Sequence, residues 1–233
     1  MIAVLAVALG AVSQGVTGIG FSLVCAPILI AVLGPREGVR SALVLSTVLN
    51  SALLVRAHRH VLVREGSLLL VPAVGSTPLL AWASRRVEAR WLTLAAGVLT
   101  VVSASALASG WRWARAARSS VAGVVAGVVS AAMNVVGSIG GPAAALYSVN
   151  AGWPASRARP TLQVVFLASN VVAIASLGFP HRWRPELFLA TAVGLGLGSL
   201  VSRRVPEHLA RSATLGVAAL GGVVAVVRAI GQG

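Results

Sequence analysis

Long stretches without a charged side chain constrain this sequence more than any other feature. Residues 2–33 and 119–151 carry no charge, and shorter uncharged stretches occupy most of the remaining chain. Only 10% of the residues are charged and the mean hydropathy is +0.90, whereas soluble domains carry about 25% charged residues. Crossing a bilayer takes about 20 apolar residues. The sequence therefore predicts an all-α, multi-pass membrane protein, and no polar segment is long enough to fold as a soluble domain.

The net charge of +14 comes entirely from arginine, since all 19 basic residues are arginines. They stand in clusters of two or three between the apolar stretches, which is typical of membrane-protein loops held at the lipid headgroups. We therefore expect the lipid bilayer, and no nucleic acid, as the partner of these arginines. The single cysteine, Cys25, allows no internal disulfide.

The uncharged stretches follow the same order twice: one long stretch, then three shorter ones. The halves also match in sequence; SRRVEARWLTLAAGVL, from Ser84, resembles SRRVPEHLARSATLGV, from Ser202. A repeat of this kind indicates an architecture built from two equivalent units. We predict two homologous halves, residues 1–110 and 119–233, joined by a basic connection at 111–118.

Each long first stretch is too long for one plain span and too short for two. If it crosses the membrane once, the protein has eight spans and parallel halves. If it turns back inside the membrane as a re-entrant hairpin, each half has three full spans and the halves are inverted. Limbs of about 15 residues are short for spanning, so we favour the hairpin and the inverted repeat.

A glycine-rich break interrupts each long stretch: GVTGIG at 15–20 and GSIGGP at 137–142. Within a membrane, non-helical backbone is tolerated only where it is buried in protein or lines a cavity. A helix that restarts after a break points its free N–H groups and positive dipole end at that place. Broken helices at corresponding positions of two halves indicate a transporter site. We predict that the two breaks face each other near the membrane midplane and bind an anion.

All five acids and all four histidines lie in or beside the polar connections. A cation pathway usually keeps an acid within its spans, so the cargo is expected to be an anion or a neutral solute. Neither H-E-x-x-H nor G-x-S-x-G is present, and hydrolytic chemistry lacks its base, metal or nucleophile. We therefore expect a secondary transporter of a small anion, with no enzyme activity, cofactor or metal. The alternative is a carrier for a neutral or zwitterionic small metabolite; a structural subunit would leave the duplicated breaks unexplained.

The predicted substrate-binding set joins glycines of the two breaks to polar side chains within the apolar stretches. Gln14 and Asn134 are 120 positions apart, as are Asn50 and Asn170. Such side chains can instead join helices through hydrogen bonds worth about 1 kcal/mol, and for these amide pairs both roles remain open. The predicted set is Gln14, Thr17, Gly18, Gly20, Ser22, Asn50, Asn134, Gly137, Ser138, Gly140, Gly141, Gln163 and Asn170.

Four motifs, GVTGIGFSLVCAPIL, GPREGVRSALVLSTVLNSALL, NVVGSIGGPAAAL and GLGLGSLVSRRV, together span nearly the whole chain. In these motifs the chain resembles the sulfite exporter TauE/SafE family. The resemblance implies movement of sulfite, sulfonates or related sulfur-containing anions across the bacterial inner membrane. The chain departs from the family pattern at Phe21, where members tend to show a further glycine. The motifs do not specify the oligomeric state, and a homodimer is compatible with them.

Overall fold

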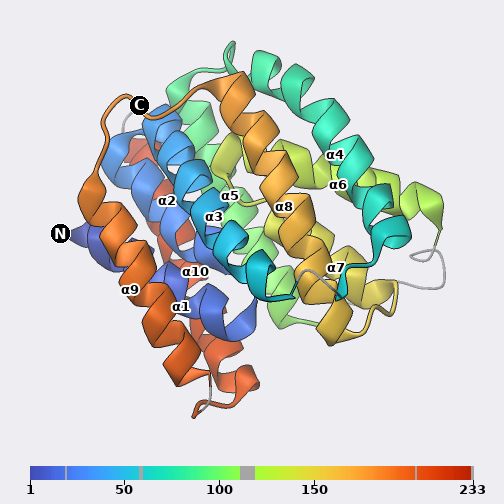
Figure 1. The fold of residues 1–233 in the computed structure, drawn as a ribbon. Helices are drawn as coiled ribbons and strands as arrows, with labels where there is room; N and C mark the ends of the chain where they lie inside the picture. Colours follow the sequence, from blue (N-terminus) through green and yellow to red (C-terminus); the bar gives the residue numbers. More distant parts are fainter. Residues whose placement is uncertain (19, 58–59, 111–118, 203, 232–233) are drawn as a thin grey trace.

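The computed structural model describes residues 1–18, 20–57, 60–110, 119–202 and 204–231. In this part of the chain the structure is helical throughout and contains no strand (Figure 1), which confirms the all-α prediction. The predicted basic connection at 111–118 lies outside the described residues, as does residue 19 of the first break. The helices are α1 (Ile2–Thr17), α2 (Phe21–Leu33), α3 (Pro35–Ala57), α4 (Val63–Ser84), α5 (Ala89–Ala108), α6 (Ser120–Gly137), α7 (Gly141–Asn150), α8 (Ala155–Leu177), α9 (Pro185–Val201) and α10 (Glu207–Gly231).

Six of the described helices are long and apolar enough to cross a membrane, judged by length and composition: α3, α4, α5, α6, α8 and α10. This number agrees with the predicted multi-pass protein, but the set differs from the predicted one. The stretch of α9, which we expected to be a full span, forms a helix of 17 residues, whereas α6 continues for 18 residues before its break. At about 1.5 Å per residue, both helices are somewhat shorter than the roughly 30 Å hydrocarbon layer.

Prolines and a serine cap mark several helix starts. Pro35, Pro142 and Pro185 stand in the first turn of α3, α7 and α9, where the missing N–H has no partner within the helix in any case. Ser119 caps α6 by accepting a hydrogen bond from the backbone N–H of Ala122 at 3.2 Å. The residues that break the helical pattern in the sequence therefore fall at the ends of these helices.

Glycines allow two pairs of helices to pack with their backbones close together. A Cβ atom at Gly194 of α9 would lie 2.5 Å from the carbonyl oxygen of Ala8 in α1. A Cβ atom at Gly127 of α6 would lie 2.5 Å from the carbonyl oxygen of Leu69 in α4. Any larger residue would push these helices apart, since membrane helices use small residues at their closest contacts. Each of the two helices that lead into a break is thus held by a helix from the other half.

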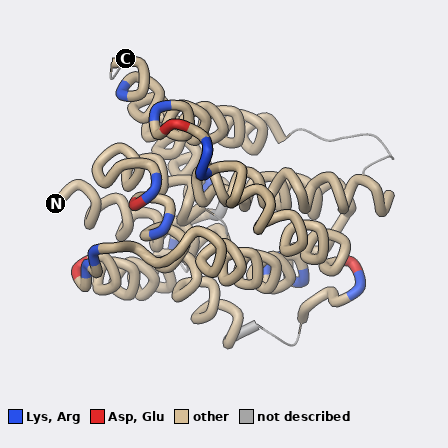
Figure 2. Tube along the Cα trace, turned by 90° about the horizontal axis from the view of Figure 1, so that it is seen from above, with Lys and Arg blue, Asp and Glu red and all other residues tan. Residues whose placement is uncertain are grey.

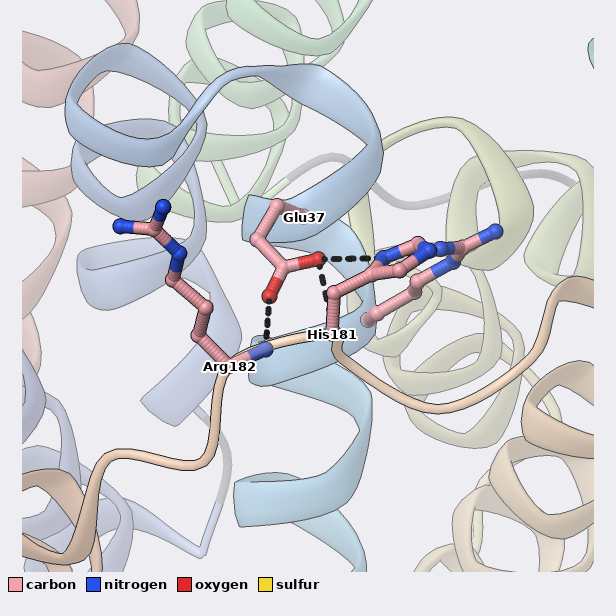
Figure 3. Close-up of polar contacts among 4 residues, drawn as sticks. Glu37, His181 and Arg182 are labelled. Atoms are coloured by element: carbon pink, nitrogen blue, oxygen red, sulfur yellow. Dashed lines mark hydrogen bonds and ion pairs between the residues drawn. The ribbon is translucent and has the colours of Figure 1, made fainter.

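The helices α3 and α8 run antiparallel. The start of α3 meets the end of α8, where the Glu37 carboxylate accepts hydrogen bonds from the backbone N–H groups of His181 and Arg182, both at 3.1 Å (Figure 3). At the other end, the Thr161 hydroxyl of α8 accepts a hydrogen bond from the N–H of Leu62, just beyond α3, at 2.8 Å.

The helices α5 and α10 are also antiparallel. The Arg211 guanidinium, near the start of α10, donates a hydrogen bond to the carbonyl oxygen of Leu107 at the end of α5, at 2.8 Å. Farther along, a Cβ atom at Gly97 would lie 2.9 Å from the carbonyl oxygen of Gly222. Each of these pairs combines one helix from each half of the chain.

The described charged residues lie in the connections and near helix ends, and the middle parts of the helices carry none (Figure 2). The interior is apolar and closely packed around Phe21, Leu29, Leu45 and Leu49, each at most 1% exposed. Buried polar side chains occur inside this apolar body, and they gather where the two breaks meet.

Candidate functional site

The two breaks begin with the same backbone turn. Gly18 and Ser138 end α1 and α6 in the left-handed conformation, with φ of 79° and 56°. Their N–H groups donate to the carbonyl oxygens of Gln14 and Asn134 at 2.8 and 2.7 Å. A left-handed conformation costs little for glycine but roughly 1–2 kcal/mol for a residue with a side chain. Ser138 therefore holds a strained backbone at the second break.

In the first break, the side chain of Gln14 links α2 to α3. Its Oε1 accepts a hydrogen bond from the backbone N–H of Phe21 at 3.0 Å, and its Nε2 donates to Oδ1 of Asn50 at 2.8 Å. The backbone N–H can only donate, so it fixes which end of the Gln14 amide faces it. The orientation of Asn50 follows, and its Nδ2 has no hydrogen-bond partner among the described residues.

In the second break, Asn134 makes the corresponding link between α6 and α8. Its Nδ2 donates to Oδ1 of Asn170 at 3.0 Å, and Asn170 Nδ2 donates to the Ser46 hydroxyl at 3.1 Å. In both halves the bonded amides are 36 residues apart. The start of α7 is fixed differently, because the Ser130 hydroxyl donates to the carbonyl oxygen of Gly140 at 2.8 Å.

A small cavity lies between the two breaks, and none of the described residues that line it has a titratable side chain. The space open to the centre of a water molecule is about 40 Å³, enough for about three waters. Only a small solute therefore fits in this conformation. Its lining consists of Gln14, Gly20, Ser22, Leu23, Ser46, Asn50, Leu107, Asn134, Ser138, Ile139, Gly140, Gly141, Pro142, Phe166 and Asn170.

Several hydrogen-bond donors belong to the residues of this lining. Gly20 precedes the first turn of α2, and Gly141 opens that of α7, so both helix N-termini begin at the cavity. Ser138 is 2% exposed, and its hydroxyl has no hydrogen-bond partner among the described residues. Helix N-termini carry partial positive charge and unpaired N–H groups. The arrangement favours a negatively charged or strongly accepting ligand without any cationic side chain.

Nine of the thirteen predicted site residues line this cavity: Gln14, Gly20, Ser22, Asn50, Asn134, Ser138, Gly140, Gly141 and Asn170. The other four lie just outside it. Thr17 lines a neighbouring cavity, and the carbonyl oxygen of Gly18 accepts a hydrogen bond from Nε2 of Gln163 at 3.0 Å. Gly137 faces Ile139 and Ala96, against which a Cβ atom would be crowded at 3.1–3.2 Å. Their positions fit support of the break backbones better than ligand contact.

Six lining residues are absent from the predicted set: Leu23, Ser46, Leu107, Ile139, Pro142 and Phe166. Ser46 lies one helical turn before Asn50, so the i, i+4 spacing on α3 was a signal for it. Leu107 and Phe166 come from α5 and α8 and carry no polar signal. At Phe21 the side chain is 1% exposed and points into the core, while its N–H is taken by Gln14.

A helical multi-pass body, with a buried cavity at two helix breaks whose described lining residues are uncharged, defines a membrane protein with a candidate solute site. The family model described as Sulfite exporter TauE/SafE matches residues 2–226, nearly the whole chain. The chain belongs to this family, whose members transport sulfur-containing anions such as sulfite across membranes, and the predicted resemblance is confirmed. No curated protein and no solved structure matches the chain.

Proposed function

We propose that this protein is a secondary transporter that exports a small sulfur-containing anion, sulfite or a sulfonate, across the bacterial inner membrane. The anion binds in the cavity between the two breaks. The observation that carries the proposal is the fixed orientation of Gln14 and Asn50. It leaves the Asn50 Nδ2 donor, in a side chain that lines the cavity, without a partner among the described residues. A cation would meet donors there, whereas an oxyanion finds hydrogen atoms directed towards it.

Three kinds of donor supply the binding. They are the first-turn N–H groups of α7 and those of α2 beyond Phe21, the Asn50 amide, and the hydroxyls of Ser22 and Ser138. Hydrogen bonds to a charged group contribute roughly 1.5–3 kcal/mol each. Together they offset part of the loss of hydration that an anion suffers in a small buried cavity. Because all the donors are neutral, the anion is not held by a full opposite charge and can leave again.

In the proposed mechanism, an inverted repeat exposes the central cavity alternately to the two sides of the membrane. The corresponding helices α3 and α8 are antiparallel, and so are α5 and α10, as two inverted halves require. The equal spacing of the Gln14–Asn50 and Asn134–Asn170 hydrogen bonds adds support. Rocking of one half against the other around a fixed central site is the usual motion of such transporters.

A carrier for a neutral or zwitterionic small metabolite is the second candidate. It is favoured by one observation: among the described residues, no cationic side chain lines the cavity. The two functions differ in their response to membrane potential, since moving one net charge is worth about 2.3 kcal/mol per 100 mV.

Flux through the purified protein in neutral-lipid vesicles tests the proposal. Vesicles loaded with methanesulfonate or sulfite are given an imposed potassium diffusion potential of either sign. We expect release of the anion to accelerate when the outside is positive and to slow when the sign is reversed. Flux that ignores the potential while no other ion moves with or against the solute, or flux that occurs only with neutral and zwitterionic solutes, would contradict the anion assignment and favour the second candidate.

A further inference from the structure

A second cavity, which we call the vestibule, adjoins the central one. Its volume open to the centre of a water molecule is about 180 Å³. Leu23 of α2 and Leu107 of α5 line both cavities, and each is 4% exposed. These two leucines therefore stand at the boundary between the central cavity and the vestibule.

Two arginines from different helices line the vestibule, Arg159 near the start of α8 and Arg211 near the start of α10. Each is anchored beside the central cavity. The Arg211 guanidinium donates to the carbonyl oxygen of Leu107 at 2.8 Å. The aliphatic part of Arg159 lies against Gly18, where a Cβ atom would be 3.1 Å from its Cγ and Cδ.

The vestibule combines this positive charge with neutral walls. Its polar lining also includes the hydroxyls of Thr17, Ser148 and Thr214, and no acid is among the described residues that line it. The remaining walls are mostly apolar, so they screen the arginines less than open water would. Clefts lined by one sign of charge concentrate ions of the other sign.

A third cavity continues the series. It has about 460 Å³ open to the centre of a water molecule and shares Leu107, Arg211 and Leu215 with the vestibule. The three cavities thus form a chain in which consecutive members share lining residues, and Arg211 stands between the second and the third.

We propose that the vestibule is a capture site for the transported oxyanion, in which Arg159 and Arg211 hold the anion before it passes Leu23 and Leu107 into the central cavity. This inference rests on the proposed function and adds a second binding site to it. The vestibule binds through full charges and the central cavity through neutral donors. The arginines raise the local concentration of the anion, and the central site selects it.

The test measures initial flux of methanesulfonate into neutral-lipid vesicles as a function of concentration, entering from the vestibule side. The variants are Arg159→Gln, Arg211→Gln and the double variant. The matched control is Arg157→Gln, an exposed arginine two residues away on the same helix that does not line the vestibule. Arg211 also donates a hydrogen bond to α5, so its loss could affect folding as well as binding. Arg211→Lys is therefore included, because it keeps the positive charge. The melting temperature of each variant in detergent reports whether it is folded.

We expect the half-saturating concentration to rise roughly tenfold in the double variant, as loss of charge-assisted hydrogen bonds predicts, with a maximal rate within about twofold of the original. The dependence of the rate on ionic strength should weaken. Arg157→Gln should change neither quantity, and Arg211→Lys should retain most of the affinity.

Unchanged half-saturation in the folded double variant would overturn the capture site while leaving the central site intact. An effect that appears only in vesicles containing anionic lipid would also overturn it, because the arginines would then hold a lipid phosphate. If the unmodified protein moves no sulfur-containing anion at all, the proposed function fails and the capture site fails with it.

Discussion

At the scale of single residues, the orientation of Asn50 determines the character of the central cavity. Replacing Asn50 by Asp keeps the acceptor for Gln14 but converts the unpaired donor into an acceptor. We expect Asn50→Asp to reduce methanesulfonate transport at least tenfold at neutral pH, in line with a lost charge-assisted hydrogen bond and an added repulsion. On acidification the protonated carboxyl becomes a donor, and transport should partly recover.

Methanesulfonate keeps its charge over this pH range, so recovery reports the side chain alone. The measurement is vesicle flux from neutral to acidic pH, with melting temperature as the folding control. Equal flux in the Asn50→Asp variant and the unmodified protein at neutral pH would show that Asn50 only joins helices.

Gly141 offers a way to narrow the cavity without disturbing the backbone. A Cβ atom there would lie 3.7 Å from the Phe166 ring, an ordinary contact, at the lining of the cavity. We expect Gly141→Ala to lower transport roughly tenfold while melting stays unchanged, because a cavity for about three waters has little room for a methyl group. Gly196→Ala is the control, since nothing lies within 4 Å of its Cβ position. Equal transport in both variants would place the site elsewhere.

The sequence predicted the amides of the cavity because they recur 120 positions apart in an apolar setting. It did not predict Leu107 or Phe166, since an apolar residue on a membrane helix carries no sign of which cavity it faces. Thr17 and Gly137 belong to the breaks but do not line the cavity. Composition does not show which of two adjacent residues in a turn faces a cavity.

At the scale of elements, the glycines and prolines predicted where α1 and α6 end and where α7 begins. They did not predict which helices of 16–18 residues would be long enough to span the membrane. We expected α9 to be a full span, whereas α6 is the helix that is long enough. Helix ends depend on the local turn and its neighbours, and so they are the least certain part of a sequence-based assignment.

The connection between α8 and α9 is held to α3 by a carboxylate. Glu37 accepts two backbone hydrogen bonds and also contacts Nδ1 of His181 at 3.2 Å. We expect Glu37→Ala to destabilise the protein by about 1–2 kcal/mol, because bonds to a charged, partly exposed acceptor are lost. Chemical denaturation in detergent measures this free energy. Glu186→Ala, which removes an exposed ion pair at 3.9 Å with Arg184, is the control and should have little effect. Equal stability of the two variants would show that this connection does not depend on Glu37.

At the scale of the whole molecule, the sequence predicted two homologous halves, but it did not predict their relative direction. The composition of the long first stretches is compatible both with a single crossing and with a re-entrant hairpin. The antiparallel contacts of α3 with α8 and of α5 with α10 favour inverted halves. We expect a periplasm-sensitive reporter fused at Met1 and one inserted within residues 111–118 to give opposite signals. Identical signals would rule out the inverted arrangement.

The described residues that line the central cavity carry no titratable side chain, and this has a consequence for ion valence. The energy needed to strip water from an ion grows with the square of its charge, whereas attraction to neutral dipoles grows only in proportion to the charge. A dipolar cavity of this kind therefore discriminates by charge number and favours monoanions. We expect methanesulfonate to stabilise the Arg159→Gln/Arg211→Gln protein against thermal unfolding at concentrations where sulfate, with a similar tetrahedral head but two charges, has no effect. Equal stabilisation by the two ions would mean that an unseen positive charge serves the cavity.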